Sequence, residues 1–445
     1  MYKIFVLTLA IFFSGCTVSK VDKNYQEILV DENQTIQIDK EWWLGYNEDY
    51  LNELIDTALK NNIDLKKSAI TINKALAQAG IISADLLPNF NATLRGEASR
   101  DIGSNSQWQE KFSTSISVSY ELDLWQKLRD SKDAAVWEVN ATQWDLQATK
   151  LSLINSIASG YFNAIYLKNA IKLYKQTLQN YEMLGKIIDY KVSFGKDEQI
   201  SQKQVQSQIL SIKNRILQTQ KNLDTIKQTL KNLLNERGDF EFKFKEIFET
   251  KPLGVDIEVP IFSLSNRPDL KASIARINEA LLNVKVSEKN FYPSLSIGAS
   301  LSDSDEKLKK SFSLNLLNGN IALNLPFLNY SRLKANLRVS EASFQSAKLE
   351  YISRLTTAIN EVYGAYKELE NDKILLNNFT EQAKNYAQIS KIYKLKYDYG
   401  KVELKEHLNA KNSELEAIIS VLEQKYKIIN NEINIFKAMA GRVQK

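Results

Sequence analysis

The sequence predicts an α+β membrane protein that contains an internal duplication, four β-strands and very long coiled-coil helices. Three observations predict this fold class. Residues of special character recur at one constant separation, several segments alternate between apolar and small polar residues, and two long stretches contain no proline. With 445 residues, the chain is long enough for one large domain or for several ordinary ones.

The N-terminus has the layout of a targeting segment. Lys3 precedes the apolar run 4–13, which is too short to cross a bilayer as a helix. Small residues follow, and then Cys16, the only cysteine. This order predicts that 1–15 is a signal peptide and that 16–47 is an N-terminal segment lipidated at Cys16. An ordinary signal peptide with a chance cysteine is the alternative. Thr17, in place of the aspartate that retains lipoproteins in the inner membrane, favours the outer membrane.

The body of the chain is two copies of one unit. Pro88 recurs as Pro293, Asn155 as Asn360, Tyr161 as Tyr366 and Gly195 as Gly400, always 205 residues apart. A constant offset across such residues indicates a repeat. We therefore predict a first structural repeat over 48–240, a linker over 241–264 and a second structural repeat over 265–445.

Each repeat is predicted to begin with a helix and to continue with two strands, within 89–123 and 293–327. Their apolar residues alternate with serine, asparagine and other polar residues, which is the period of a two-sided strand. Phe112, Ile116 and Val118 should face lipid, and the intervening serines should face water. The last strand is expected to include Phe312 and Leu314 and to run on to Leu325.

Two long helices should follow the strands in each repeat. No proline occurs in 89–251 or 327–445, and apolar residues there recur at steps of three and four. From Arg129 to Val192 nothing interrupts the pattern, which predicts a helix on the order of 100 Å long. Gly195 and Gly400 interrupt it in the two repeats, so each pair of helices should form a hairpin that turns near its glycine.

Four strands with an apolar face cannot stay open in a membrane. Unpaired edges are costly in hydrocarbon, and membrane-spanning barrels have eight or more strands. Three copies would give twelve strands, and the long helices would continue that wall as a coiled-coil tube. A soluble β-sandwich with a helical stalk is the alternative.

Composition excludes several other classes. The formal net charge is +5 and no basic block stands out, so no nucleic-acid partner is expected. His407 is the only histidine, which argues against a metal site with soft ligands and against a cysteine–histidine nucleophile. A site made of carboxylates alone stays open, but no motif indicates one. The phosphate-loop, dinucleotide and nucleophile-elbow motifs are missing from the sequence. We therefore expect neither an enzyme nor a cofactor other than the lipid on Cys16.

Motifs along the whole mature chain resemble those of the TolC-type outer-membrane efflux proteins, in the lipoprotein (NodT-type) branch. The motifs are EWWLGYNEDYLNELIDTALKNNIDL at 41–65, YELDLWQKLR at 120–129, RPDLKAS at 267–273, FYPSLSIG at 291–298 and LPFLNYSRLKA at 325–335. The resemblance implies a homotrimer with a twelve-stranded β-barrel in the outer membrane and an α-barrel across the periplasm.

The resemblance also implies the function. The protein would be the passive exit duct of a tripartite efflux pump, with a periplasmic adaptor and a proton-driven inner-membrane transporter as partners. The outer-membrane channel of a type I protein or peptide secretion system is an alternative. A periplasmic adaptor is another, although it would carry a lipoyl-like domain and lack two-sided strands.

Members of this family close at the hairpin tips, and the resemblance places the gate around Gly400. The family has a tyrosine three residues before this glycine and carboxylates six and nine residues after it. Those positions hold Tyr397, Glu406 and Asn409. Asn409 departs from the pattern, because the family has a carboxylate there. Val402 stands where an arginine is expected, and Ser201 stands where the acidic partner of that arginine is expected. We therefore expect packing and hydrogen bonds, rather than that ion pair, to hold the gate. His407 should lie at the interface between the helices.

Overall fold

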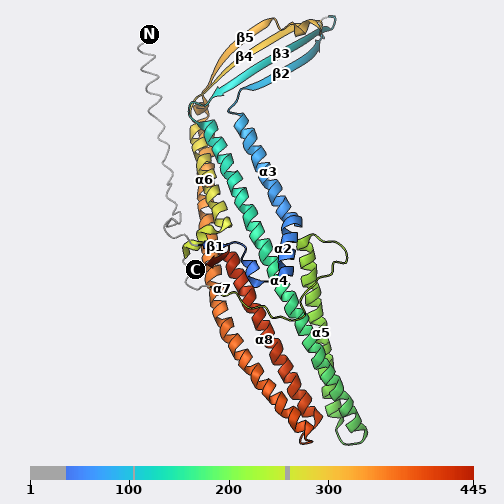
Figure 1. The fold of residues 1–445 in the computed structure, drawn as a ribbon. Helices are drawn as coiled ribbons and strands as arrows, with labels where there is room; N and C mark the ends of the chain where they lie inside the picture. The colour runs from blue at the N-terminus through green and yellow to red at the C-terminus, as the bar shows by residue number, and fades with distance from the viewer. Residues whose placement is uncertain (1–36, 104–105, 256–260, 445) are drawn as a thin grey trace. The chain divides into compact units, whose positions relative to one another are not determined.

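The computed structural model describes residues 37–103, 106–255 and 261–444 (Figure 1). Cys16 and the rest of 1–36 lie outside the described residues. The chain divides into two compact units. The first contains Ile70–Trp144 and Lys271–Ser353, and the second contains 37–69, Asp145–Leu270 and 354–444. Among the described residues, no helix combines the length and the apolar character needed to span a membrane.

The first unit carries a four-stranded antiparallel sheet in the order β2–β3–β4–β5. Its strands are β2 (Asn89–Ser99), β3 (Gln109–Leu122), β4 (Ser294–Asp305) and β5 (Leu316–Asn324). The register of the strands places apolar residues beside apolar residues on the neighbouring strands. Ile116 lies opposite Ala92 and Leu301, and Leu301 lies opposite Leu317. One face is therefore apolar and the other polar, as the alternation predicted.

The polar face carries a ladder of serines. On β3 and β4, Ser113 lies opposite Ser304, Ser115 opposite Ser302 and Ser117 opposite Ser300. These pairs come from the two halves of the duplicated sequence. The sheet therefore joins the two repeats along the strands that they contribute to its centre.

The expectation that the last strand includes Phe312 and Leu314 is wrong. Residues Lys310–Ser313 form a short 3-10 helix, and Leu314 has a φ of 48°, which ends any extended run. The Ser311 hydroxyl lies 3.2 Å from that of Thr114 on β3, and Ser311 is fully buried. The loop thus folds back onto the sheet instead of extending the strand.

Long helices adjoin the sheet in sequence. These are α3 (Ile63–Ala84), α4 (Lys127–Ser193), α6 (Pro268–Lys289) and α7 (Tyr330–Asp398). The 67 residues of α4 and the 69 of α7 each correspond to about 100 Å of helix. This agrees with the length predicted from the uninterrupted pattern.

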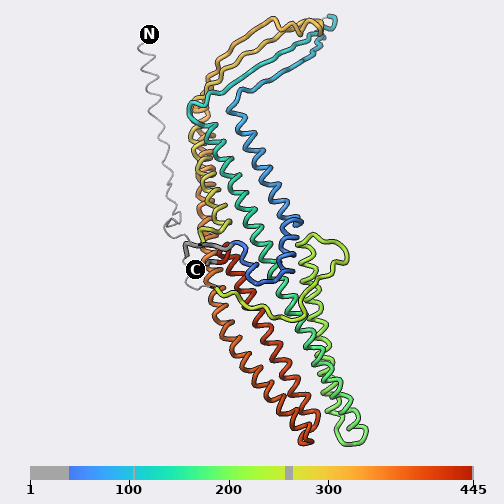
Figure 2. Tube along the Cα trace, viewed as in Figure 1, coloured from blue at the N-terminus to red at the C-terminus, as the bar shows by residue number. Residues whose placement is uncertain are grey.

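The second unit contains the helical hairpins and the main core. The C-terminal part of α4 returns as α5 (Gln199–Leu234), and that of α7 returns as α8 (Leu404–Ala438) (Figure 2). The helix α2 (Asp49–Asn61) and a turn at Trp42–Tyr46 complete the core. Trp42, Phe162 and Phe436 are fully buried there. A small sheet pairs β1 (Gln37–Asp39) with β6 (Arg442–Gln444).

Two buried carboxylates hold the segment between the repeats against the helices. Glu48 accepts hydrogen bonds from the hydroxyls of Tyr161 and Thr250. Glu432 accepts from the Tyr46 hydroxyl and from the backbone N–H groups of Leu253 and Gly254. Burial raises the pKa of Glu432. The described part of the linker up to Gly254 therefore belongs to the folded core of the second unit.

Candidate functional site: the hairpin ends and the sheet

The two hairpin turns have the same backbone geometry. Gly195 and Gly400 adopt φ values of +64° and +66°, in the left-handed region that glycine tolerates. The N–H of Gly195 donates to the carbonyl of Val192, and that of Lys196 to Lys191; the second turn repeats both bonds 205 residues on. This is the Schellman pattern of a helix that ends at a glycine. The glycines thus lie at the ends of the hairpins.

Tyr397 and His407 meet across the second hairpin. Their rings stack with centroids 6.2 Å apart and planes inclined by 16°. Burial and then the charge of Lys394 lower the pKa of His407. The ring therefore lies between helices, where the sequence analysis expected it, but its contact with Tyr397 was not anticipated.

Glu406 and Asn409 occupy the first turns of α8. Glu406 is half-buried, and its Oε2 atom has no hydrogen-bond partner within the described residues. Asn409 is exposed. Within one copy of the described chain, neither a hydrogen bond nor a ring contact joins Tyr397 to Glu406 or to Asn409.

An ion pair that the sequence analysis missed joins the ends of the two hairpins. The Lys191 ammonium, near the end of α4, donates to the Glu403 carboxylate, at the N-cap of α8. The hydrogen bond to Glu403 raises the pKa of Lys191. Ser201 donates to Asp197 and lowers the pKa of that carboxyl. Charged residues therefore do connect the hairpins, at positions other than 201 and 402.

Further contacts between the hairpins follow α4 and α8, and Arg215 on α5 pairs with Glu416 on α8 at 3.4 Å. Leu408 packs with Leu184 and Ile188, the amide of Asn180 donates to that of Asn412 at 2.8 Å, and Tyr166 stacks on Tyr426. These contacts fix the register between the hairpins. They align Lys191 with Glu403 although 212 residues separate the two in sequence.

Each outer strand of the sheet pairs on one side only within the described chain. Every residue of β2 and of β5 is exposed, and within the described chain neither strand has a second neighbour. Apolar side chains such as Phe90, Ile321 and Leu323 are exposed on the apolar face. An apolar face and two open edges are features of a sheet that is completed by other molecules.

Comparisons with known proteins agree with this architecture. A family model described as "Outer membrane efflux protein" matches residues 54–236 and 262–441. The chain therefore belongs to the outer membrane efflux protein family, whose fold is that of an outer-membrane channel. It is an outer-membrane protein with an efflux role.

Individual relatives and structures cover almost the whole chain. "Toxin and drug export protein A" of Aggregatibacter actinomycetemcomitans is 36% identical over 424 residues, which span 94% of this chain and 91% of the relative. "Cation efflux system protein CusC" of Escherichia coli K12 is 24% identical, covering 90% and 88%. The crystal structure of the Campylobacter jejuni CmeC outer membrane channel superposes with a TM-score of 0.79 at 24% identity, covering 97% and 95%.

Proposed function

We propose that the protein is the passive exit duct of a tripartite efflux pump, and that it works as a homotrimer. Three four-stranded sheets would close into a twelve-stranded β-barrel in the outer membrane, and the hairpins would form an α-barrel in the periplasm. The observation that carries this proposal is the two-faced sheet with two unpaired edges. Because β2 and β5 run in opposite directions, copies can join edge to edge and keep every pair antiparallel.

The hairpins of the second unit support the same assembly. Apolar side chains are exposed along α5, at Leu210 and Leu217, and along the part of α7 in the second unit, at Tyr363, Ile374 and Ile392. In a ring of copies, the exposed side of α5 in one copy could cover that of α7 in the next. Burial of such side chains contributes roughly 25 cal/mol per Å².

The assembly can be tested on the detergent-extracted protein. An unheated sample should migrate on a denaturing gel as a trimer that heat converts to monomer, and it should form channels in planar bilayers. Migration as a monomer in both samples, together with no conductance, would contradict the duct.

The cargo is proposed to be small toxic compounds delivered by a periplasmic adaptor and a proton-driven inner-membrane transporter. A relative is named for the export of both toxin and drug, so export of a protein or peptide is the second candidate. Deleting the gene should increase sensitivity to toxic compounds. Loss of a secreted polypeptide with no change in sensitivity would favour the second candidate.

We further propose that Cys16 carries the lipid and that the barrel remains the main membrane anchor. Radiolabelled palmitate should then enter the wild type but not Cys16→Ser, and both should assemble. Equal labelling of the two proteins would refute lipidation at this residue.

The gate is proposed to lie at the hairpin ends, with Glu406 facing the axis and Tyr397, Asn409 and the Lys191–Glu403 pair holding the closed form. Three carboxylates around one axis would favour cations. Glu406→Ala should weaken cation preference in bilayer recordings, and His407→Asn should leave it unchanged because that ring lies between helices. Unaltered selectivity in Glu406→Ala would exclude it from the constriction.

A further inference from the structure

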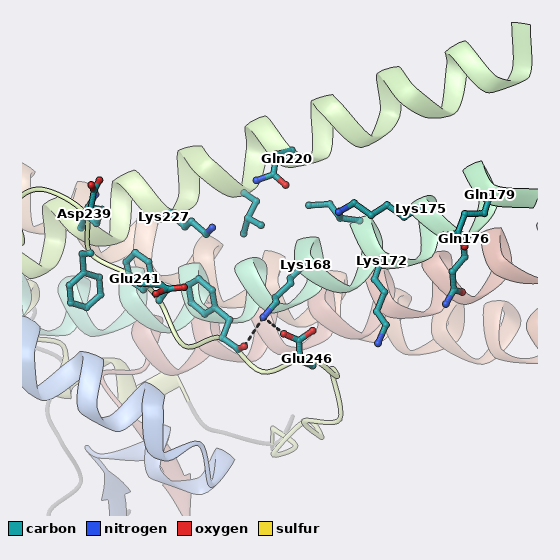
Figure 3. A pocket seen from close by; sticks show the side chains of 16 residues that line it. Lys168, Lys172, Lys175, Gln176, Gln179, Gln220, Lys227, Asp239, Glu241 and Glu246 are labelled. Atoms are coloured by element: carbon teal, nitrogen blue, oxygen red, sulfur yellow. Dashed lines mark hydrogen bonds and ion pairs between the residues drawn. The ribbon is translucent and has the colours of Figure 1, made fainter. Parts of the chain in front are cut away.

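A groove rich in lysine lies in the second unit, away from the hairpin ends. It has a volume of about 940 Å³ and is lined by α4, α5 and the segment 239–246 (Figure 3). Its lysines are Lys168, Lys172 and Lys175 on α4 and Lys227 and Lys231 on α5. Only three carboxylates, Asp239, Glu241 and Glu246, line it with them. The groove therefore has an excess of two positive charges.

Most of these lysines form no ion pair with a carboxylate of the described residues. Lys168 pairs with Glu246 and also donates to the carbonyl of Phe244 at 3.1 Å (Figure 3). The described residues provide no ion pair to the other four lysines. Like charges three and four residues apart on a helix repel each other. An anion bound between α4 and α5 would relieve this repulsion.

The segment beside the lysines has the sequence of a β-strand but no strand partner. In 240–246, phenylalanine alternates with charged residues, the period of a two-sided strand. Phe242 and Phe244 stack with centroids 5.0 Å apart and pack against the core, whereas Glu241, Lys243 and Lys245 are exposed. Throughout the described chain no strand pairs with this segment. Lys168 occupies the carbonyl of Phe244 and Tyr50 contacts the backbone of Lys243, so an extended peptide could add along the other backbone groups of this segment.

We propose that this groove binds an extended acidic segment of a partner polypeptide. Carboxylates of the segment would pair with Lys172, Lys175 and Lys227, and its backbone would lie along 240–246. The amides of Gln176, Gln179 and Gln220 also line the groove and could donate to peptide carbonyls. The lining from Lys168 to Gln179 spans about 17 Å of helix, which matches about five extended residues.

The proposed site is separate from the gate. Lys175 precedes Gly195 by 20 residues, or about 30 Å of helix. An interaction in the groove would therefore add an attachment point for a partner beside the helical wall. It does not depend on whether the hairpin ends open or close.

Binding can be measured with a labelled hexapeptide of alternating glutamate and threonine on the full-length protein in detergent. The peptide should bind, its affinity should fall with salt, and its glutamine analogue should not bind. Lys172→Gln/Lys175→Gln/Lys227→Gln should weaken binding by about tenfold or more. The matched variant Lys150→Gln/Lys203→Gln/Lys221→Gln, on the same two helices but outside the groove, should bind as the wild type does.

The position of the peptide can be determined independently by carbodiimide crosslinking and mass spectrometry. Crosslinks should join its glutamates to Lys172, Lys175 or Lys227. Equal binding by both triple variants, or crosslinks confined to other lysines, would overturn the proposal. Displacement by inorganic phosphate at constant ionic strength, or binding of phosphatidylglycerol vesicles without binding of the peptide, would reassign the groove to a phosphate-bearing ligand. Unchanged circular dichroism of both variants would confirm that they are folded.

Discussion

Glu279 on α6 retains its proton at an unusually high pH. Burial, followed by the charge and hydrogen bond of Glu138, raises the pKa of Glu279 to about 7, although Arg276 and Asn283 oppose the shift. The folded protein therefore binds a proton that the unfolded chain releases above the ordinary value of 4.5. The stability that this proton contributes is complete below 4.5 and is lost as pH rises through 7.

Glu279→Gln should consequently stabilise the protein in a pH-dependent way. At pH 8, the melting temperature of this variant should exceed that of the wild type. The free energy of unfolding should rise by roughly 1 kcal/mol, a modest value because the carboxyl group is partly exposed and screened by solvent. The gain should be smaller at pH 5. Thermal unfolding followed by circular dichroism would measure both. An equal gain at the two pH values, or the same profile in Glu288→Gln on the same helix, would disprove the assignment to Glu279.

The Lys191–Glu403 pair should influence how readily the hairpins separate. Lys191→Met or Glu403→Gln should raise the open probability of channels in bilayer recordings, by about two- to fivefold for so exposed a pair. The charge reversal Lys191→Glu/Glu403→Lys should restore the wild-type value, because it reinstates the attraction. If the reversal behaves like the single variants, the pair does not hold the hairpins together.

Sequence could not identify this pair, for a physical reason. The glycine turns follow from local backbone geometry, so Gly195 and Gly400 were visible in the repeat alone. By contrast, Lys191 meets Glu403 only because packing around Leu408 sets the register between two hairpins. One signal was present, since Glu403 and its repeat partner Glu198 both stand at the N-cap of a returning helix.

At the scale of elements, the sequence correctly predicted which residues of each strand share a face, because successive side chains of a strand point to opposite faces of the sheet. The loop before β5 was misassigned because Phe312 and Leu314 continue that alternation, and only the contact of Ser311 with Thr114 reveals the fold-back. On β3 and β4, the apolar face therefore carries the polar pair Thr114 and Asp303 beside this loop. Asp303, next to this loop, accepts a hydrogen bond from Asn315 at 3.1 Å.

The two faces of β3 should respond differently to charge. Val118 belongs to the apolar face and Ser117 to the serine ladder. Val118→Lys should cost roughly 2–4 kcal/mol near the membrane midplane and lower the yield of heat-sensitive trimer, whereas Ser117→Lys should be tolerated. Equal yields, or the reverse order, would show that the apolar face is not directed at lipid.

At the scale of the whole molecule, each repeat supplies two strands and one hairpin, and the offset of 205 residues made that organisation readable from sequence. The strands through which copies would meet could not be predicted from the sequence, because the order of the strands decides which of them lie at the edges of the sheet. The structure identifies these as β2 and β5, with 11 and 9 residues. An isolated protomer in lipid would expose their backbone groups, each at a cost of several kcal/mol.

The open edges have a genetic consequence. In a ring of three, every subunit must pair through both of its edge strands. A subunit blocked at one edge would therefore prevent closure of each ring that it enters. The double variant Asn318→Pro/Gly319→Pro should block the free edge of β5. Adjacent residues of a strand direct their N–H groups to opposite sides, so one of the two prolines must remove a donor from the free edge. Expressed in equal amount with the wild type, it should act as a dominant inhibitor and leave about one-eighth of the rings intact. Retention of half the heat-sensitive trimers would instead mean that blocked subunits never join a ring. Defective subunits would then be excluded before the barrel assembles.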